Sequence, residues 1–89
     1  MEQLFELLVN NFFEIKVKKK FNRIILRQNS LYHFVLTKNG DIIYIYLVLD
    51  FGLLSYFLGL KIIEKIELFK FEIINILTKN KYDYKFISH

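Results

Sequence analysis

The chain has 89 residues, a formal net charge of +4, and neither cysteine nor proline. This length fits one domain, and the absence of cysteine excludes a disulfide framework and a thiolate metal site. Two histidines, His33 and His89, are too few for a structural zinc site. Hydrophobic residues nevertheless make up 54% of the chain, more than a small monomer easily buries. Biased codon usage and burial against partner molecules both explain this excess, and the two are compatible.

The first third of the chain predicts a helix, a basic connector and a short strand. Residues 1–14 place Leu4, Leu7, Leu8 and Phe12 at helical spacing, with polar residues on the other side. Residues 16–20 are almost entirely lysine and read as a connector. Residues 22–27 form the first expected strand.

A hairpin follows, with strands at residues 31–37 and 42–49. Lys38-Asn39-Gly40-Asp41 separates the two apolar runs. We expect Asn39 and Gly40 to form the turn, because both tolerate the positive φ that tight hairpins require. The continuous apolar sequence of residues 42–49 predicts a strand that is buried on both faces.

The last third of the chain predicts a long helix at residues 60–79 and a strand at residues 82–87, after a glycine-punctuated loop or helical start at residues 50–59. The expected buried stripe of the helix consists of Ile62, Ile63, Ile66, Phe69, Ile73, Ile74 and Leu77. A helix of this length between two strands is long enough for a crossover that makes them parallel.

These elements predict a single α/β or α+β domain, residues 1–89. Its mixed sheet would have about four strands: three antiparallel strands within residues 22–49 and one added after the crossover helix. The N-terminal helix and the long helix complete the expected fold.

The apolar run of residues 42–63 also has the length of a membrane span. Asp50 would then lie near the bilayer centre, which is costly, and Gly52 and Gly59 interrupt the run. We therefore do not expect a membrane span, although a small subunit of a membrane complex remains an alternative.

Positive charge is concentrated in residues 15–40, which contain no acidic residue. A block of one sign is typical of phosphate binding. The alternative is an edge strand that lysines protect from pairing with other chains. The basic residues of this block are Lys16, Lys18, Lys19, Lys20, Arg23, Arg27 and Lys38.

The order of elements resembles the eleventh small-subunit ribosomal protein family, the universal protein of the ribosomal platform. Asn29-Ser30 falls at the family's corner between strands, residues 37–41 at its hairpin turn, and residues 50–52 at its glycine-rich loop. Residues 60–79 match its long helix and residues 82–88 its next strand. In total the resemblance covers residues 22–89.

The chain departs from the family pattern in three places. The glycine-rich loop lacks its arginine and most of its glycines, which puts RNA contact there in doubt. The N-terminal helix has no counterpart in the family. The family's Gly-Pro-Gly loop, further helix and basic tail have no counterpart in this sequence.

The resemblance implies a structural component of the small ribosomal subunit that binds rRNA, contacts neighbouring small-subunit proteins and performs no catalysis. It implies a diverged organellar form, with a mitochondrial ribosome expected ahead of a plastid one. If the protein is not organellar, we expect it in the cytoplasm. Its RNA contacts would be to shape and backbone. The candidate RNA-binding residues are Lys16, Lys18, Lys19, Lys20, Arg23, Arg27, Lys38 and Asn39.

We expect no catalytic residues, cofactor, metal or small-molecule substrate. Ser30 is close to His33 in the sequence, but no plausible catalytic triad accompanies them. Asp50 fits a turn or a helix cap better than a catalytic acid. A small α+β protein-binding module, such as a phage or plasmid inhibitor, is the main alternative function.

Overall fold

The computed structural model describes residues 2–50 and 60–87, and this part of the chain is an α+β fold with two helices and a five-stranded mixed sheet. The predicted class is therefore confirmed, with one strand more than expected. The elements are α1 (Glu2–Asn11), β1 (Lys16–Lys20), β2 (Arg23–Arg27), β3 (Tyr32–Asn39), β4 (Ile42–Leu49), α3 (Leu60–Lys79) and β5 (Asp83–Ile87).

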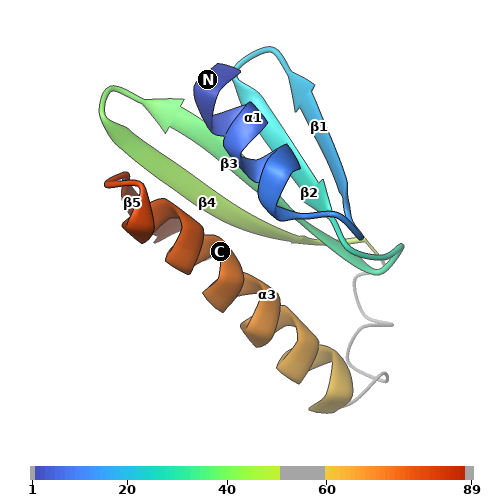
Figure 1. The fold of residues 1–89 in the computed structure, drawn as a ribbon. Helices are drawn as coiled ribbons and strands as arrows, with labels where there is room; N and C mark the ends of the chain where they lie inside the picture. Colours follow the sequence, from blue (N-terminus) through green and yellow to red (C-terminus); the bar gives the residue numbers. More distant parts are fainter. Residues whose placement is uncertain (1, 51–59, 88–89) are drawn as a thin grey trace.

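The strands lie in the sheet in the order in which they occur in the chain, β1-β2-β3-β4-β5 (Figure 1). The first four are antiparallel neighbours, and β5 pairs with β4 in parallel. A parallel neighbour requires a crossover connection, and α3 lies within it. The predicted crossover helix matches the bounds of α3.

The lysine-rich segment is a strand, so the prediction of a connector was wrong. β1 has only one apolar residue, Val17, and shows no hydrophobic alternation. Its extended conformation depends on pairing with β2, from Lys16 opposite Arg27 to Lys20 opposite Arg23. Tertiary pairing here outweighs the weak local preference.

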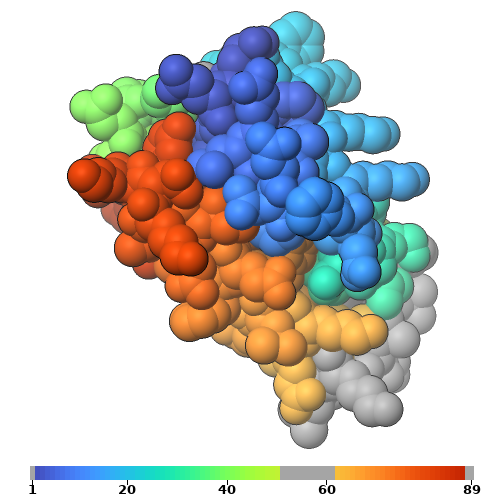
Figure 2. Space-filling view, in the orientation of Figure 1, coloured from blue at the N-terminus to red at the C-terminus, as the bar shows by residue number. Residues whose placement is uncertain are grey.

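Both helices pack on the same side of the sheet and enclose the core. Figure 1 shows α1 in front of the strands and α3 beside β4 and β5, and Figure 2 shows the two helices in contact across this side. The ring of Phe69 in α3 packs edge-on against Phe12 and Phe34, with both centroid distances 5.4 Å. The buried core is Leu4, Leu8, Ile24, Leu26, Tyr32, Phe34, Leu36, Ile43, Ile45, Ile66, Phe69, Ile73 and Leu77.

The predicted stripe of α3 is largely right. Ile66, Phe69, Ile73 and Leu77 are buried, and Ile62 and Ile74 are half-buried. Ile63 was wrongly included, because it is 57% exposed. It lies to the side of the row that repeats at three and four residues, so it points past the sheet.

The end of α3 is closed by a left-handed residue. Lys81 has φ +62°, its N–H donates to the carbonyl of Thr78 (3.1 Å), and the N–H of Tyr82 donates to that of Leu77 (2.9 Å). These two bonds define a Schellman motif, in which glycine usually occupies the position of Lys81. The chain is thereby turned into β5.

The β3–β4 turn is displaced by one residue from the predicted one. Asn39 pairs with Ile42, so the loop consists of Gly40 and Asp41. Gly40 has φ +64°, whereas neither Asn39 nor Asp41 has a positive φ. Glycine at the first position of a two-residue loop is the type II′ arrangement, which matches strand twist.

Candidate nucleic-acid interface

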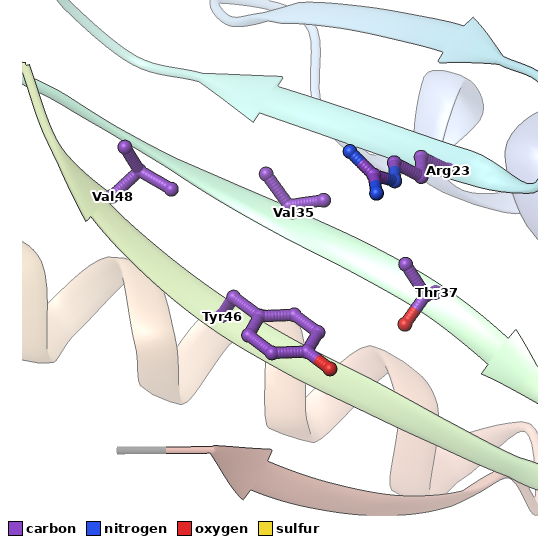
Figure 3. Close-up of a pocket in the computed structure, with 5 residues that line it drawn as sticks. All are labelled: Arg23, Val35, Thr37, Tyr46 and Val48. Atoms are coloured by element: carbon purple, nitrogen blue, oxygen red, sulfur yellow. The ribbon is translucent and has the colours of Figure 1, made fainter. Parts of the chain in front are cut away.

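The side of the sheet opposite the helices is here called the open face. Side chains alternate across a sheet, so the buried residues of β2, β3 and β4 fix which residues point the other way. Figure 3 looks onto this side, with the helices behind the sheet. The open face of β1–β4 consists of Lys16, Lys18, Lys20, Arg23, Ile25, Arg27, His33, Val35, Thr37, Asn39, Ile42, Tyr44, Tyr46 and Val48.

No described element covers the open face. Tyr44, Tyr46 and Val48 are only half-buried, whereas Ile43 and Ile45 on the other side are fully buried. The prediction that residues 42–49 are buried on both faces was therefore wrong. The apolar side chains that point away from the helices form part of a surface.

Three of the four lysines of β1 lie together on the open face. Lys16, Lys18 and Lys20 occur at alternate positions and are exposed. By strand pairing they stand beside Arg27, Ile25 and Arg23 respectively. Figure 2 shows side chains of this light-blue segment extending beyond the edge of the molecule. The resulting cluster of cations lies along one margin of the open face.

Lys19 is on the opposite side of the sheet from that cluster. It pairs with Ile24, which is buried, and its ammonium group donates a hydrogen bond to Glu2 of α1. This hydrogen bond and the positive charge of Lys19 lower the pKa of Glu2. The pair attaches α1 to β1, so Lys19 does not contribute to the open face.

Arg27 lies at the other end of β2 and is neutralised by Asp50. Its Nη1 lies 2.9 Å from Oδ2 of Asp50, and its Nη2 lies 3.4 Å from Oδ1. Nη1 also donates to the backbone carbonyl of Asn29 at 3.2 Å. A guanidinium with these partners offers less positive charge to a ligand than the free cations nearby.

His33 completes this cluster. Its Nδ1 lies 3.0 Å from Nη2 of Arg27 and 3.1 Å from Oδ2 of Asp50. The first contact needs Nδ1 as an acceptor and the second needs it as a donor. Burial opposes the charge of Asp50, but the hydrogen bonds from Arg27 and His33 outweigh it, so the pKa of Asp50 lies below its ordinary value.

Asp50 was expected to serve a turn or cap a helix, and it lies in a turn at the end of β4. Its side chain holds Arg27 and His33, and its backbone N–H donates to the carbonyl of Leu31 at 2.9 Å. The predicted loop or helical start at residues 51–59 lies outside the described residues.

Lys38 and Asn39 lie on opposite sides of the sheet. Both are exposed at the end of β3. Lys38 pairs with the buried Ile43, so alternation places it on the helix side, whereas Asn39 is on the open side. The structure thus groups Lys16, Lys18, Lys20 and Arg23, brings Arg27 to the same face as an ion pair, and separates Lys19 and Lys38 from them.

The centre of the open face is hollowed. A depression of about 320 Å³ lies between β2, β3 and β4. Figure 3 shows the side chains that line it: Arg23, Val35, Thr37, Tyr46 and Val48. A second depression, of about 800 Å³, adjoins it and shares Arg23, Thr37 and Tyr46. The two depressions share these residues and extend from the β1–β2 turn to β4, and we call them together the trough.

Sequence reasoning missed Tyr44, Tyr46 and Phe21 as surface residues. Tyr44 and Tyr46 are two residues apart, which places both rings on the same side of β4. That spacing was the available signal, but an uninterrupted apolar run conceals it. Phe21 lies in the β1–β2 turn, and no turn was expected there because β1 was not recognised.

Residues 2–50 and 60–87 contain no group of three histidine, cysteine or acidic side chains that could hold a metal ion. Neither described helix is long and apolar enough to cross a membrane. Residues 42–49 are a strand, so the alternative of one helical span over residues 42–63 is contradicted in its first part. No family model, curated protein or solved structure matches this chain.

Proposed function

We propose that this chain is a non-catalytic RNA-binding protein, a structural component of a small ribosomal subunit, with a mitochondrial ribosome ahead of a plastid one. The observation that carries the proposal is the group of exposed cations on an uncovered sheet face: Lys16, Lys18, Lys20 and Arg23. None of the four forms an ion pair with another described residue.

A polyanion is the ligand that suits such a face. Lysine and arginine side chains displace the cations condensed on a nucleic acid, and this release drives binding. Four phosphate contacts to a single strand give a slope of about −3 for the logarithm of the affinity against the logarithm of the salt concentration. The half-buried tyrosines beside the cations favour a ligand with both phosphates and aromatic rings.

The ribosomal assignment rests in addition on the sequence resemblance over residues 22–89. Its implied partners are rRNA and neighbouring small-subunit proteins. Exposed apolar side chains on α3, Leu68 at 66% and Phe71 at 62%, suit the second kind of partner. The same side chains would suit the alternative, a protein-binding module, which predicts no affinity for RNA.

A salt titration with matched lysine variants tests RNA binding. The double variant Lys18→Ala and Lys20→Ala removes two cations from the open face. The control, Lys65→Ala and Lys79→Ala, removes two exposed cations from α3. We expect the first pair to reduce the salt slope by about 1.5 and the control to leave it nearly unchanged.

Equal slopes for the two double variants would contradict the assignment of the open face, and salt-independent binding would contradict RNA binding itself. The ribosomal part is tested by sedimentation of the tagged chain with separated subunits from a mitochondrial lysate. We expect it with the small subunit at low salt. Sedimentation with the large subunit, or with neither, would refute that part.

A further inference from the structure

The tip of the β1–β2 hairpin carries a phenylalanine in an unfavourable backbone conformation. Lys20 pairs with Arg23, so Phe21 and Asn22 form a two-residue loop. Phe21 has φ +56°, and glycine is the residue that ordinarily occupies the first position of such a loop. A bulky side chain with positive φ is strained, and strain of this kind concentrates at functional sites.

Packing in the core does not explain the ring of Phe21. It is 86% exposed, so it adds little to the core. The structure shows instead that Phe21 lines the trough, in the depression bounded also by Lys20, Arg23 and Tyr46. The strained residue and the hollow of the open face are therefore parts of one surface.

The chemistry of the trough is cationic and aromatic. The residues that line it include the cations Lys20 and Arg23 and the rings of Phe21 and Tyr46, and none of the described lining residues is acidic. Aromatic rings beside a cationic groove bind unpaired bases by stacking, because every base has a flat face. A base inside a duplex has no free face to offer.

We propose that the trough holds a single-stranded RNA segment, with one base stacked on Phe21 and another on Tyr46. This inference rests on the proposed RNA binding and adds to it the form of RNA that is recognised. Arg23 stands on β2, between the β1–β2 turn and β4, and Lys20 is paired beside it; both contact the phosphates that join the stacked bases. Phosphate contacts hold the strand, and stacking selects an unpaired one.

The variant Phe21→Gly separates stacking from stability. It removes the ring and relieves the positive φ, so the hairpin should melt at the same or a higher temperature. Phe13→Ala is the matched control, because Phe13 is 89% exposed and does not line the trough. The probes are an oligouridylate of about ten nucleotides and an RNA duplex with the same number of phosphates.

We expect Phe21→Gly to weaken oligouridylate binding roughly fivefold to a hundredfold and to change duplex binding by less than about twofold. Phe13→Ala should change neither affinity. For Tyr46, the variant Tyr46→Phe keeps a ring and should retain affinity, whereas Tyr46→Ala should lose it.

Suppose the wild-type chain binds RNA with the expected salt slope, but Phe21→Gly binds the oligouridylate as tightly as Phe13→Ala does. Stacking in the trough is then refuted, while the proposed RNA binding stands. The inference also fails if Phe21→Gly weakens single-strand and duplex binding equally. If the wild-type chain binds neither RNA with a salt dependence, the proposed function fails and the inference fails with it. Loss of binding to anionic phospholipid vesicles in Phe21→Gly, with RNA binding intact, would overturn the inference in favour of a membrane surface.

Discussion

Asp50 restrains the positive charge of the open face, so replacing it with asparagine should strengthen RNA binding. The carboxylate contacts Arg27 through both oxygens, at 2.9 and 3.4 Å. Asparagine has the same size and retains one accepting oxygen, but it carries no charge. In Asp50→Asn the guanidinium keeps its bond to the carbonyl of Asn29 but loses the neighbouring negative charge, so its own charge becomes available to a phosphate.

The expected gain follows from one additional phosphate contact. Each contact changes the salt slope by about 0.7 to 0.9, so if affinity near 1 M salt is unchanged, affinity near 0.1 M rises about fivefold to eightfold. The loss of folding stability should be small. Both partners are partly exposed, with side-chain accessibilities of 34% and 24%, and such pairs contribute at most about 1 kcal/mol.

Fluorescence anisotropy with a labelled single-stranded RNA, repeated at several salt concentrations, measures this effect. Asp50→Asn should bind more tightly and with a steeper slope than the wild-type chain. In an Arg27→Ala background the same substitution should give no gain, because no guanidinium is released. Glu72→Gln, which removes an exposed acid from α3, is the control for net charge.

The reasoning is refuted if Asp50→Asn weakens binding. It is also refuted if the gain persists undiminished without Arg27, because the effect would then be one of overall charge. A gain of the same size in Glu72→Gln would lead to the same conclusion.

Three further predictions concern stability. At Lys81, which has a left-handed backbone, the Lys81→Gly variant should have a free energy of unfolding about 1 kcal/mol higher than Lys81→Ala. At the helical Lys79, Lys79→Gly should instead be about 1 kcal/mol less stable than Lys79→Ala. Thermal melts that show the same sign at both sites would contradict the Schellman assignment. Phe69→Ala should cost about 3 to 5 kcal/mol because Phe69 is 1% exposed, whereas Phe71→Ala at the surface should cost less than about 0.5 kcal/mol, both measured by urea unfolding. The pKa of Asp50 is lower in the folded chain than in the unfolded one. The ionised carboxylate therefore stabilises the fold above the unfolded pKa of about 3.9, and this contribution is lost as the pH falls through the folded pKa. Below about pH 4, denaturation midpoints should fall less steeply in Asp50→Asn than in the wild-type chain.

The apolar elements were predictable because their patterns report burial directly. Residues 42–49 and 60–79 coincide with β4 and α3, and the alternation after residue 82 matches β5 to within one residue. In each case the period of the hydrophobic residues identifies the element. The parallel pairing of β4 and β5 follows from the length of the helix between them.

The errors occur where partners in space decide the conformation. β1 has no apolar alternation, and only its pairing with β2 makes it a strand. The α1 helix ends at Asn11, three residues early, where the side-chain amide donates to the carbonyl of Leu7 at 2.7 Å. The continuous apolar run of β4 concealed the spacing of Tyr44 and Tyr46, which was the available signal that one face of this strand is uncovered.

The candidate site was predictable only in part. Lysines at alternate positions 16, 18 and 20 lie together because β1 is extended, and the charge block alone could not separate them from Lys19. The ion pair of Arg27 with Asp50 joins residues that are 23 positions apart. No local pattern contains that contact, and the position of Phe21 in a strained turn is equally hidden.

The sequential order of the strands has a consequence for how the chain assembles during synthesis. Two-residue loops join β1 to β2 and β3 to β4, so these contacts have low contact order and form early. A nascent chain of about fifty residues can therefore complete the meander and pack α1 on it. The apolar sheet surface that α3 covers then remains exposed to water until the C-terminal third has left the exit tunnel. We expect the nascent chain to be most prone to self-association during that interval.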